Sequence, residues 1–237
     1  MSTSTDLVSC LKISLPYAAF CFSVHILSYA IFNGRLKSFA KKDKTAFYNR
    51  TVSTIHAIVM FSLSLYYWLF LNPTMQIGEY VDEYQAKCVL VMLGYLVYDT
   101  VFELSASKQV MTLGHHILGG ASHISVLYSY NGACGFYSMI IFLAEASTPL
   151  LNASWLFQKL GMLKTTLFKL CALLLILAFF VFRVILSPYM LWHMWTYRAQ
   201  WGENRDQLFW FNFLIVGSFG LLNYYWFYKL VQLALKK

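Results

Sequence analysis

Long apolar stretches separated by short polar segments dominate the chain. Seven of them reach the length, roughly 20 residues, that an α-helix needs to cross a bilayer. They cover about residues 11–32, 51–71, 86–104, 112–130, 133–157, 165–186 and 207–233. Breaker pairs follow three of them, at Asn72-Pro73, Asn131-Gly132 and Ser187-Pro188, where helices are expected to stop. The pattern predicts an all-α membrane protein, a single bundle of about seven transmembrane helices.

The composition strengthens this prediction. The chain has 237 residues, of which 59% are hydrophobic and 12% charged, whereas soluble domains are about a quarter charged. The apolar surplus runs along the whole chain, so we expect one membrane domain. Five cysteines contain no C-x-x-C pair, which excludes a recognisable disulfide or zinc-finger framework.

The basic residues give the predicted helices a direction, because cytoplasmic segments carry the excess of Lys and Arg. Thirteen fall on one side and four on the other, Lys12, Lys87, Arg198 and Arg205. We therefore predict a non-cytoplasmic N-terminus and a cytoplasmic C-terminus. This placement between apolar stretches also argues against nucleic-acid binding, despite the net charge of +8. The thirteen are Arg35, Lys37, Lys41, Lys42, Lys44, Arg50, Lys108, Lys159, Lys164, Lys169, Lys229, Lys236 and Lys237.

Two further segments have an expected place at the membrane surface. The basic segment 35–50 is interpreted as a topology signal, and it could also dock phosphates of anionic lipids or of coenzyme A. The segment 188–201 is rich in amphipathic rings, which prefer the headgroup level. We expect it to form an interfacial helix or a re-entrant piece after a break at Pro188. A short eighth span is less favoured, because it would place the C-terminal lysines on the wrong side. Its rings belong to Tyr189, Trp192, Trp195, Tyr197 and Trp201.

Polar side chains recur inside the predicted spans, where a charged group costs about 2.5 to 3.5 kcal/mol. Glu145, Thr148 and Asn152 share one helix face by their spacing. Asp99 near His115 or His116 would form a carboxylate–imidazole pair suited to general-base chemistry. We expect these faces to converge on one cytosol-facing pocket. The other polar residues in spans are His56, Glu103, His123, Arg183 and Asn223.

Any one of these groups could also serve only as an interhelical hydrogen bond, and that interpretation is preferred for His25, His193 and Asn223. The six histidines form no H-x-x-H-H box, which argues against a di-iron site. No metal is expected, although a zinc ion held by His115, His116, His123 and an acid is an open alternative. Between the histidines, Gly119 and Gly120 would let a neighbouring helix approach closely.

Four motifs occur in a familiar order: RTVSTIH ending at His56, GYLVYD ending at Asp99, GHH ending at His116, and EASTPLLN from Glu145 to Asn152. In this order they resemble the TLC family, which includes translocating-chain-associating proteins, ceramide synthases and a ceroid-lipofuscinosis protein. The last motif is most similar to the small TLC-domain-containing transmembrane proteins. The resemblance covers residues 41–233, after an N-terminal span and basic loop over 1–40 and before a cytosolic tail over 234–237.

The resemblance implies a role in membrane-lipid metabolism or homeostasis. In ceramide synthases the paired histidines and a later pair of aspartates move a fatty acyl group from coenzyme A to an amine. His115 and His116 match that pair, whereas Glu145 and Asn152 replace the aspartate motif and Gly119 replaces a threonine. The family also implies a location in the endoplasmic reticulum.

Three functions stay open at this point. The first is an acyltransferase that uses acyl-CoA and binds no other cofactor, with His115, His116 and Asp99 as catalytic residues. The second is a non-catalytic lipid-binding regulator of membrane composition, and the third is a lipid transporter or trafficking adaptor. In each case membrane lipids are the expected partners. The expected substrate-binding residues are His56, His123, Glu145, Thr148, Asn152 and Arg183.

Overall fold

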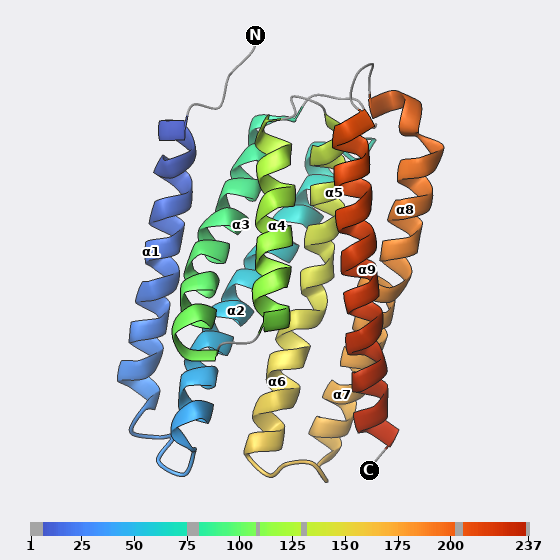
Figure 1. The fold of residues 1–237 in the computed structure, drawn as a ribbon. Coiled ribbons are helices and arrows are strands. Elements are labelled where there is room, and N and C mark those ends of the chain that lie inside the picture. Colours follow the sequence, from blue (N-terminus) through green and yellow to red (C-terminus); the bar gives the residue numbers. More distant parts are fainter. Residues whose placement is uncertain (1–6, 75–80, 108–109, 129–131, 202–205, 236–237) are drawn as a thin grey trace. The chain divides into compact units, whose positions relative to one another are not determined.

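The computed structural model describes residues 7–74, 81–107, 110–128, 132–201 and 206–235, and all regular structure within them is helical (Figure 1). Five of the residues used above, Lys108, Asn131, Arg205, Lys236 and Lys237, lie outside the described part. The α-helices are α1 (Leu7–Phe32), α2 (Lys41–Tyr66), α3 (Glu83–Phe102), α4 (Val110–Tyr128), α5 (Gly132–Phe142), α6 (Thr148–Lys159), α7 (Thr166–Phe179), α8 (Leu186–Thr196) and α9 (Asp206–Leu235).

Shorter segments of different pitch extend or join these helices. Tyr67–Leu71 continues α2, Glu103–Ser107 continues α3 and Phe180–Ile185 joins α7 to α8, all three with π-helical bonding. Leu143–Ser147 joins α5 to α6 as a tighter 3₁₀ turn, and Arg198–Trp201 forms another. The second residue of α6 is Pro149, which cannot donate to the carbonyl four residues earlier. This missing bond explains why the chain tightens just before α6.

Six helical stretches in the described chain are long and apolar enough to cross a membrane. The predicted fourth span coincides with α4, which is 19 residues long but carries His115, His116 and His123 and is less apolar for that reason. The prediction of an all-α, multi-pass membrane protein is confirmed. The six stretches are Leu7–Phe32, Lys41–Leu71, Glu83–Ala106, Cys134–Lys159, Thr166–Thr196 and Asp206–Ala234.

The predicted helix break at Ser187-Pro188 is wrong. The helix runs without interruption over Thr166–Thr196. A proline crowds the carbonyl four residues earlier, here that of Val184, but Val184 belongs to the π-helical segment, where regular α-helical bonding is already suspended. In addition, the Ser187 hydroxyl donates to the Arg183 carbonyl at 2.8 Å. The expected interfacial helix is thus the end of a membrane helix.

The aromatic side chains beyond Pro188 divide into two groups. Tyr189, Trp192, Trp195 and Tyr197 are exposed, as headgroup-level rings would be. Trp201 is instead buried, 1% exposed, with its ring 5.5 Å from that of Phe209. Trp201 therefore belongs to the core. The expectation that its ring lies at the headgroup level is wrong.

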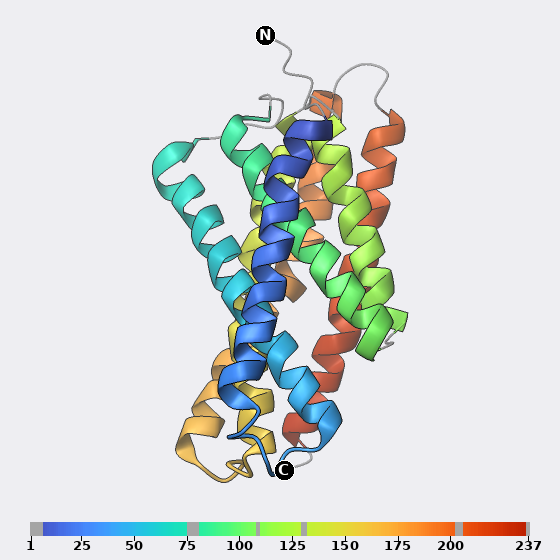
Figure 2. The same ribbon diagram turned by 90° about the vertical axis from the view of Figure 1, so that its left-hand side faces the viewer.

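By internal packing the chain forms two units, which we describe separately. Unit 1 comprises Met1–His56 and Tyr80–Ser138. Within it α1 packs along α3 and α3 packs against α4 (Figure 1), and in Figure 2 α1 crosses in front of α3. Gly94 permits this approach, because a Cβ there would overlap the Ser14 carbonyl oxygen. The close approach expected at Gly120 is not seen, since a Cβ there meets no atom within 4 Å.

Unit 2 comprises Ala57–Glu79 and Met139–Lys237. Here α6 packs against α7, α8 packs against α9, and α9 also contacts α7 and the π-helical segment that follows it (Figure 1). The Ser64 hydroxyl of α2 donates to the Met139 carbonyl of α5. The buried side chains of this unit include Leu175, Phe179, Met190, Met194 and Phe209.

Candidate functional site

A buried carboxylate–imidazole pair lies in unit 1. Asp99 is in the last turn of α3, and His116 is in the second turn of α4. The His116 Nε2 atom lies 3.0 Å from Asp99 Oδ2, and both side chains are buried. Sequence reasoning expected Asp99 to pair with His115 or His116, and the structure places His116 in that position.

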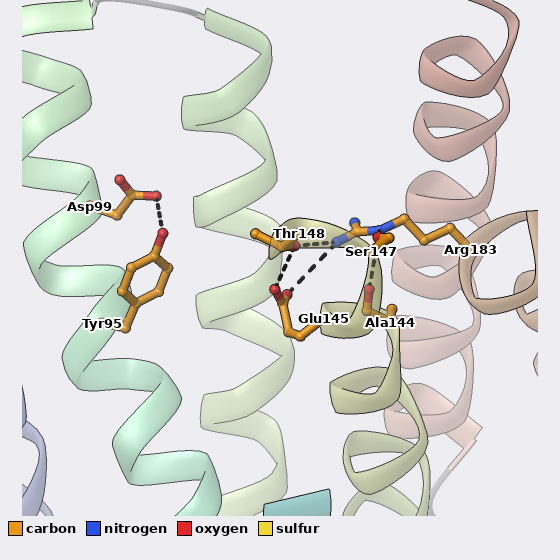
Figure 3. Close-up of polar contacts among 7 residues, drawn as sticks. All are labelled: Tyr95, Asp99, Ala144, Glu145, Ser147, Thr148 and Arg183. Atoms are coloured by element: carbon orange, nitrogen blue, oxygen red, sulfur yellow. Dashed lines mark hydrogen bonds and ion pairs between the residues drawn. The ribbon is translucent and has the colours of Figure 1, made fainter. Parts of the chain in front are cut away.

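Two more donors hold the Asp99 carboxylate. Asn49 of α2 donates from Nδ2 to Oδ1 at 3.1 Å, and the Tyr95 hydroxyl donates to Oδ2 at 3.1 Å. The dashed line from Tyr95 to Asp99 in Figure 3 marks the second bond. Tyr95 and Asp99 are one helical turn apart, so their side chains share a face of α3. Together with His116, three donors from three helices fix the orientation of the carboxylate.

The second nitrogen of the His116 ring differs from the first in its surroundings. Its Nδ1 atom is buried and has no hydrogen-bond partner within the described chain. Because the other nitrogen is held by Asp99, the ring is fixed with one nitrogen bound and one open, which is the arrangement of an acid–base catalyst. The neighbouring His115 ring lies 6.0 Å away, centroid to centroid, at an angle of 64°.

His56 adds a second imidazole to this part of unit 1. Its Nδ1 is hydrogen-bonded to the Tyr17 hydroxyl at 3.1 Å, and its ring stacks on that of Tyr95 at 3.8 Å and 8°. The His56 Nε2 atom is also buried without a hydrogen-bond partner in the described chain. His56 is therefore joined to Asp99 through the ring of Tyr95.

A chain of hydrogen bonds extends behind Asp99 to α1. The Tyr98 hydroxyl donates to Asn49 Oδ1 at 2.9 Å, and His25 Nδ1 is hydrogen-bonded to the same hydroxyl at 2.7 Å. The interhelical role expected for His25 matches this contact. Sequence reasoning missed Asn49, Tyr95 and Tyr98. Only the spacing of Tyr95 from Asp99 gave a usable signal, because the contacts of Asn49 and Tyr98 depend on how α1, α2 and α3 pack.

A second polar cluster lies in unit 2, around Arg183 (Figure 3). Arg183 Nε donates to the Ser147 hydroxyl at 2.8 Å, and Nη2 donates to the Thr148 hydroxyl at 3.1 Å. The Thr148 hydroxyl in turn donates to Glu145 Oε2 at 2.8 Å. Glu145 Oε1 lies 3.9 Å from Arg183 Nη2, and the guanidinium also lies 5.4 Å from the Phe179 ring centre.

This cluster joins two helices at the points where both depart from α-helical bonding. Ser147 ends the 3₁₀ turn before α6, and Arg183 lies in the π-helical segment after α7. The shared face predicted for Glu145 and Thr148 is present. The structure also brings Arg183, another of the predicted substrate-binding residues, to this turn.

The remaining predicted residues are buried outside these two clusters: His123, Asn152, Glu103 and Asn223. In the described chain, no three His, Cys, Asp or Glu side chains are grouped so that they could hold a metal ion. The alternative zinc set of His115, His116, His123 and an acid is therefore not assembled. The convergence of both polar clusters on one pocket stays a prediction, as does the catalytic or binding role of each residue.

Comparison with known proteins identifies relatives of the chain. Residues 46–232 match a model of the TLC domain. TLC domain-containing protein 4 of Xenopus tropicalis is 27% identical over 195 residues, covering 78% of this chain and 73% of the relative. TLC domain-containing protein 4-B of Xenopus laevis is 26% identical over 179 residues, covering 72% and 68%. The protein of that same name in Danio rerio is 26% identical over 147 residues, covering 59% and 54%.

Proposed function

Because the chain belongs to the TLC domain family, we propose that this multi-pass membrane protein acts in lipid metabolism as an acyltransferase whose acid–base pair is His116 and Asp99. One observation carries the proposal: Asp99 holds His116 at Nε2 while Nδ1 is buried and has no partner in the described chain. A fixed imidazole with one open nitrogen is costly in a membrane helix, and this cost is explained if the nitrogen exchanges protons.

The proposed step begins when His116 Nδ1 takes the proton of a lipid amine or hydroxyl. As this proton leaves, the hydroxyl oxygen or the neutral amine nitrogen attacks the carbonyl carbon of an acyl-CoA thioester, and a tetrahedral intermediate forms. The carbon–sulfur bond then breaks, and the imidazolium returns its proton to the departing thiolate. Free coenzyme A and the acylated lipid are the products. Asp99 keeps its charge throughout and stabilises the imidazolium that forms between the two proton transfers.

Neighbouring residues support this step in different ways. Asn49 and Tyr95 are positioning residues, because they fix the carboxylate that orients His116. His56 offers a buried nitrogen on the far side of the Tyr95 ring, and we assign it a substrate-binding role. The basic residues at the turn between α1 and α2, among them Arg35 and Lys37, are suited to the phosphates of coenzyme A. We propose the endoplasmic reticulum as the site of action, with the family resemblance as its support.

The test is an acyl-transfer assay with the purified protein. The wild-type chain is reconstituted in nanodiscs with mixed membrane lipids and supplied with radiolabelled acyl-CoA, beside the variants His116→Ala and His115→Ala. We expect labelled lipid from the wild type and a loss of about 10²- to 10⁴-fold in His116→Ala, the usual contribution of a general base. We expect a smaller loss of lipid labelling in His115→Ala than in His116→Ala.

Two results would count against the proposal. If the wild type transfers no label to any lipid, the acyltransferase is abandoned in favour of a protein that binds lipids without making a bond. If both histidine variants transfer label at the wild-type rate, the reaction proceeds without the proposed base. Thermal unfolding of each variant serves as the control for folding.

A further inference from the structure

The Arg183 cluster of unit 2 lies at a depth where charged groups are most costly. Arg183 is near the middle of the helical stretch Thr166–Thr196, and Glu145 is near the middle of Cys134–Lys159. Both stretches are long enough to cross a membrane, so their centres lie in the hydrocarbon region. An ionisable side chain at that depth calls for a partner or a function.

The contacts within the cluster leave one hydrogen-bond donor and one hydrogen-bond acceptor unused. Arg183 uses Nε and Nη2 for the hydroxyls of Ser147 and Thr148, and Nη1 has no acceptor within the described chain. Glu145 Oε2 accepts from Thr148, whereas Oε1 lies 3.9 Å from Arg183 Nη2. That separation is too long for a hydrogen bond. The same ion pair therefore keeps one donor, Nη1, and one acceptor, Oε1, without a hydrogen bond in the described chain.

The two charged side chains of the cluster are partly exposed. The side chain of Arg183 is 13% exposed and that of Glu145 is 24% exposed. The nearby apolar side chains of Leu151, Phe180 and Val181 are exposed as well, as expected for surfaces that contact lipid.

We propose that Arg183 and Glu145 form a binding site for an uncharged lipid alcohol, such as a diacylglycerol. A hydroxyl group accepts one hydrogen bond and donates another, so it can take the Nη1 donor and satisfy Oε1 together. The cluster is already neutral as a pair of opposite charges, and an anionic headgroup would add a net charge in the hydrocarbon. A neutral hydroxyl adds none. This inference is independent of the proposed acyl transfer, because it uses other residues and requires no reaction.

The test measures binding without acyl-CoA. A diacylglycerol that carries a photoreactive group and a reporter tag in one acyl chain is cross-linked to the wild-type protein in nanodiscs. Unlabelled competitors are then added: diacylglycerol, its methyl ether, which lacks the hydroxyl hydrogen, and phosphatidic acid, which carries a phosphate. We expect diacylglycerol to compete at least tenfold better than either of the other two.

Variants identify the site. Arg183→Gln and Glu145→Gln each remove one of the two proposed partners, and labelling should fall at least tenfold in both. Arg198→Gln is the matched control, because Arg198 pairs with Asp206 at 2.9 Å on an exposed surface and should label like the wild type. Because Arg183→Gln could unfold the chain, the competition series with the wild type is an independent test.

Other outcomes would overturn the proposal. Equal competition by the methyl ether would show that the hydroxyl is not recognised, and stronger competition by phosphatidic acid would show an anion site. Unchanged labelling in folded Arg183→Gln and Glu145→Gln would leave the cluster as an interhelical contact only.

Discussion

The carboxylate of Asp99 accepts hydrogen bonds from donors on three helices. All three donors bind the same negatively charged group. Asn49 binds one oxygen, while Tyr95 and His116 bind the other. Hydrogen bonds to a charged group are stronger than those between neutral groups. This arrangement explains how a buried acid is retained in α3 and makes Asp99 the residue on which the orientation of His116 depends.

Asp99→Asn tests this dependence with little change in size. The amide keeps one accepting oxygen, but its NH₂ group cannot accept on the other side and the side chain no longer stabilises a charged imidazolium, so acyl transfer should fall at least about 10²-fold. The control is Asp206→Asn, which breaks the exposed pair with Arg198 and should leave the rate unchanged, since exposed pairs contribute little. A transfer rate within twofold of wild type in Asp99→Asn would contradict the assigned role.

Tyr95→Phe separates the ring stacking of Tyr95 on His56 from its hydrogen bond to Asp99. The ring keeps its stacking on His56, but the hydroxyl bond to Asp99 is lost. We expect the free energy of unfolding, measured by denaturant titration in mixed micelles, to fall by about 1.5 to 3 kcal/mol, the range for a hydrogen bond to a charged group. Tyr29→Phe alters an exposed tyrosine of the same unit. It should change the free energy of unfolding by less than about 0.5 kcal/mol. Equal losses in both variants would argue against the bond.

The sequence predicted the residue types of this site better than their contacts. Intramembrane polarity singled out Asp99 and His116, because both interrupt apolar stretches. Asn49 lies outside the predicted span, at the start of α2, and was noticeable only as part of the possible glycosylation sequon Asn49-Arg50-Thr51. Its contact with Asp99 arises from the packing of α2 against α3, which no local pattern contains. A side chain held by that contact is poorly suited to carry a glycan.

At the scale of elements, the predicted and the observed helices differ where the helical pitch changes locally. The lengths of the apolar stretches correctly predicted where the long helices lie. The helix break predicted at Pro188 is wrong, because the helix continues through this proline after a π-helical segment. At Gly120, one of the two glycines predicted to allow a close helix approach, no atom lies within 4 Å of an added Cβ, whereas α1 approaches α3 closely at Gly94. Such choices depend on which helix is the neighbour, and the sequence alone does not specify it.

Gly94→Ala tests the packing of α1 on α3. The added methyl group meets the Ser14 carbonyl and, at 3.1 Å, the Tyr17 Cβ, so α1 must shift. We expect a loss of about 1 to 3 kcal/mol in the free energy of unfolding, as for other overpacked positions. Gly120→Ala is the matched control, because its methyl group meets no atom within 4 Å and a helical alanine is favoured by about 0.5 to 1 kcal/mol. Similar stabilities of the two variants would contradict the observed packing.

At the scale of the whole molecule, the charge asymmetry predicts which ends face the cytosol. Lys37, at the exposed turn between α1 and α2, should be cytoplasmic, and exposed Gln200, between α8 and α9, should not. In a Cys10→Ser background, cysteine at position 37 should react with an impermeant maleimide from the cytosolic side. Cysteine at position 200 should react only after the membrane is permeabilised. The reversed pattern would invert the predicted topology.

The central claim is that the buried His116–Asp99 pair moves an acyl group to a lipid, and its most direct test is the stoichiometry of that reaction. Free coenzyme A thiol and labelled lipid are measured together in nanodiscs that contain the purified wild type. The account predicts one thiol released for each lipid acylated, with both falling in parallel in His116→Gln. Thiol release without acylated lipid, or neither product above the level of protein-free nanodiscs, would contradict it.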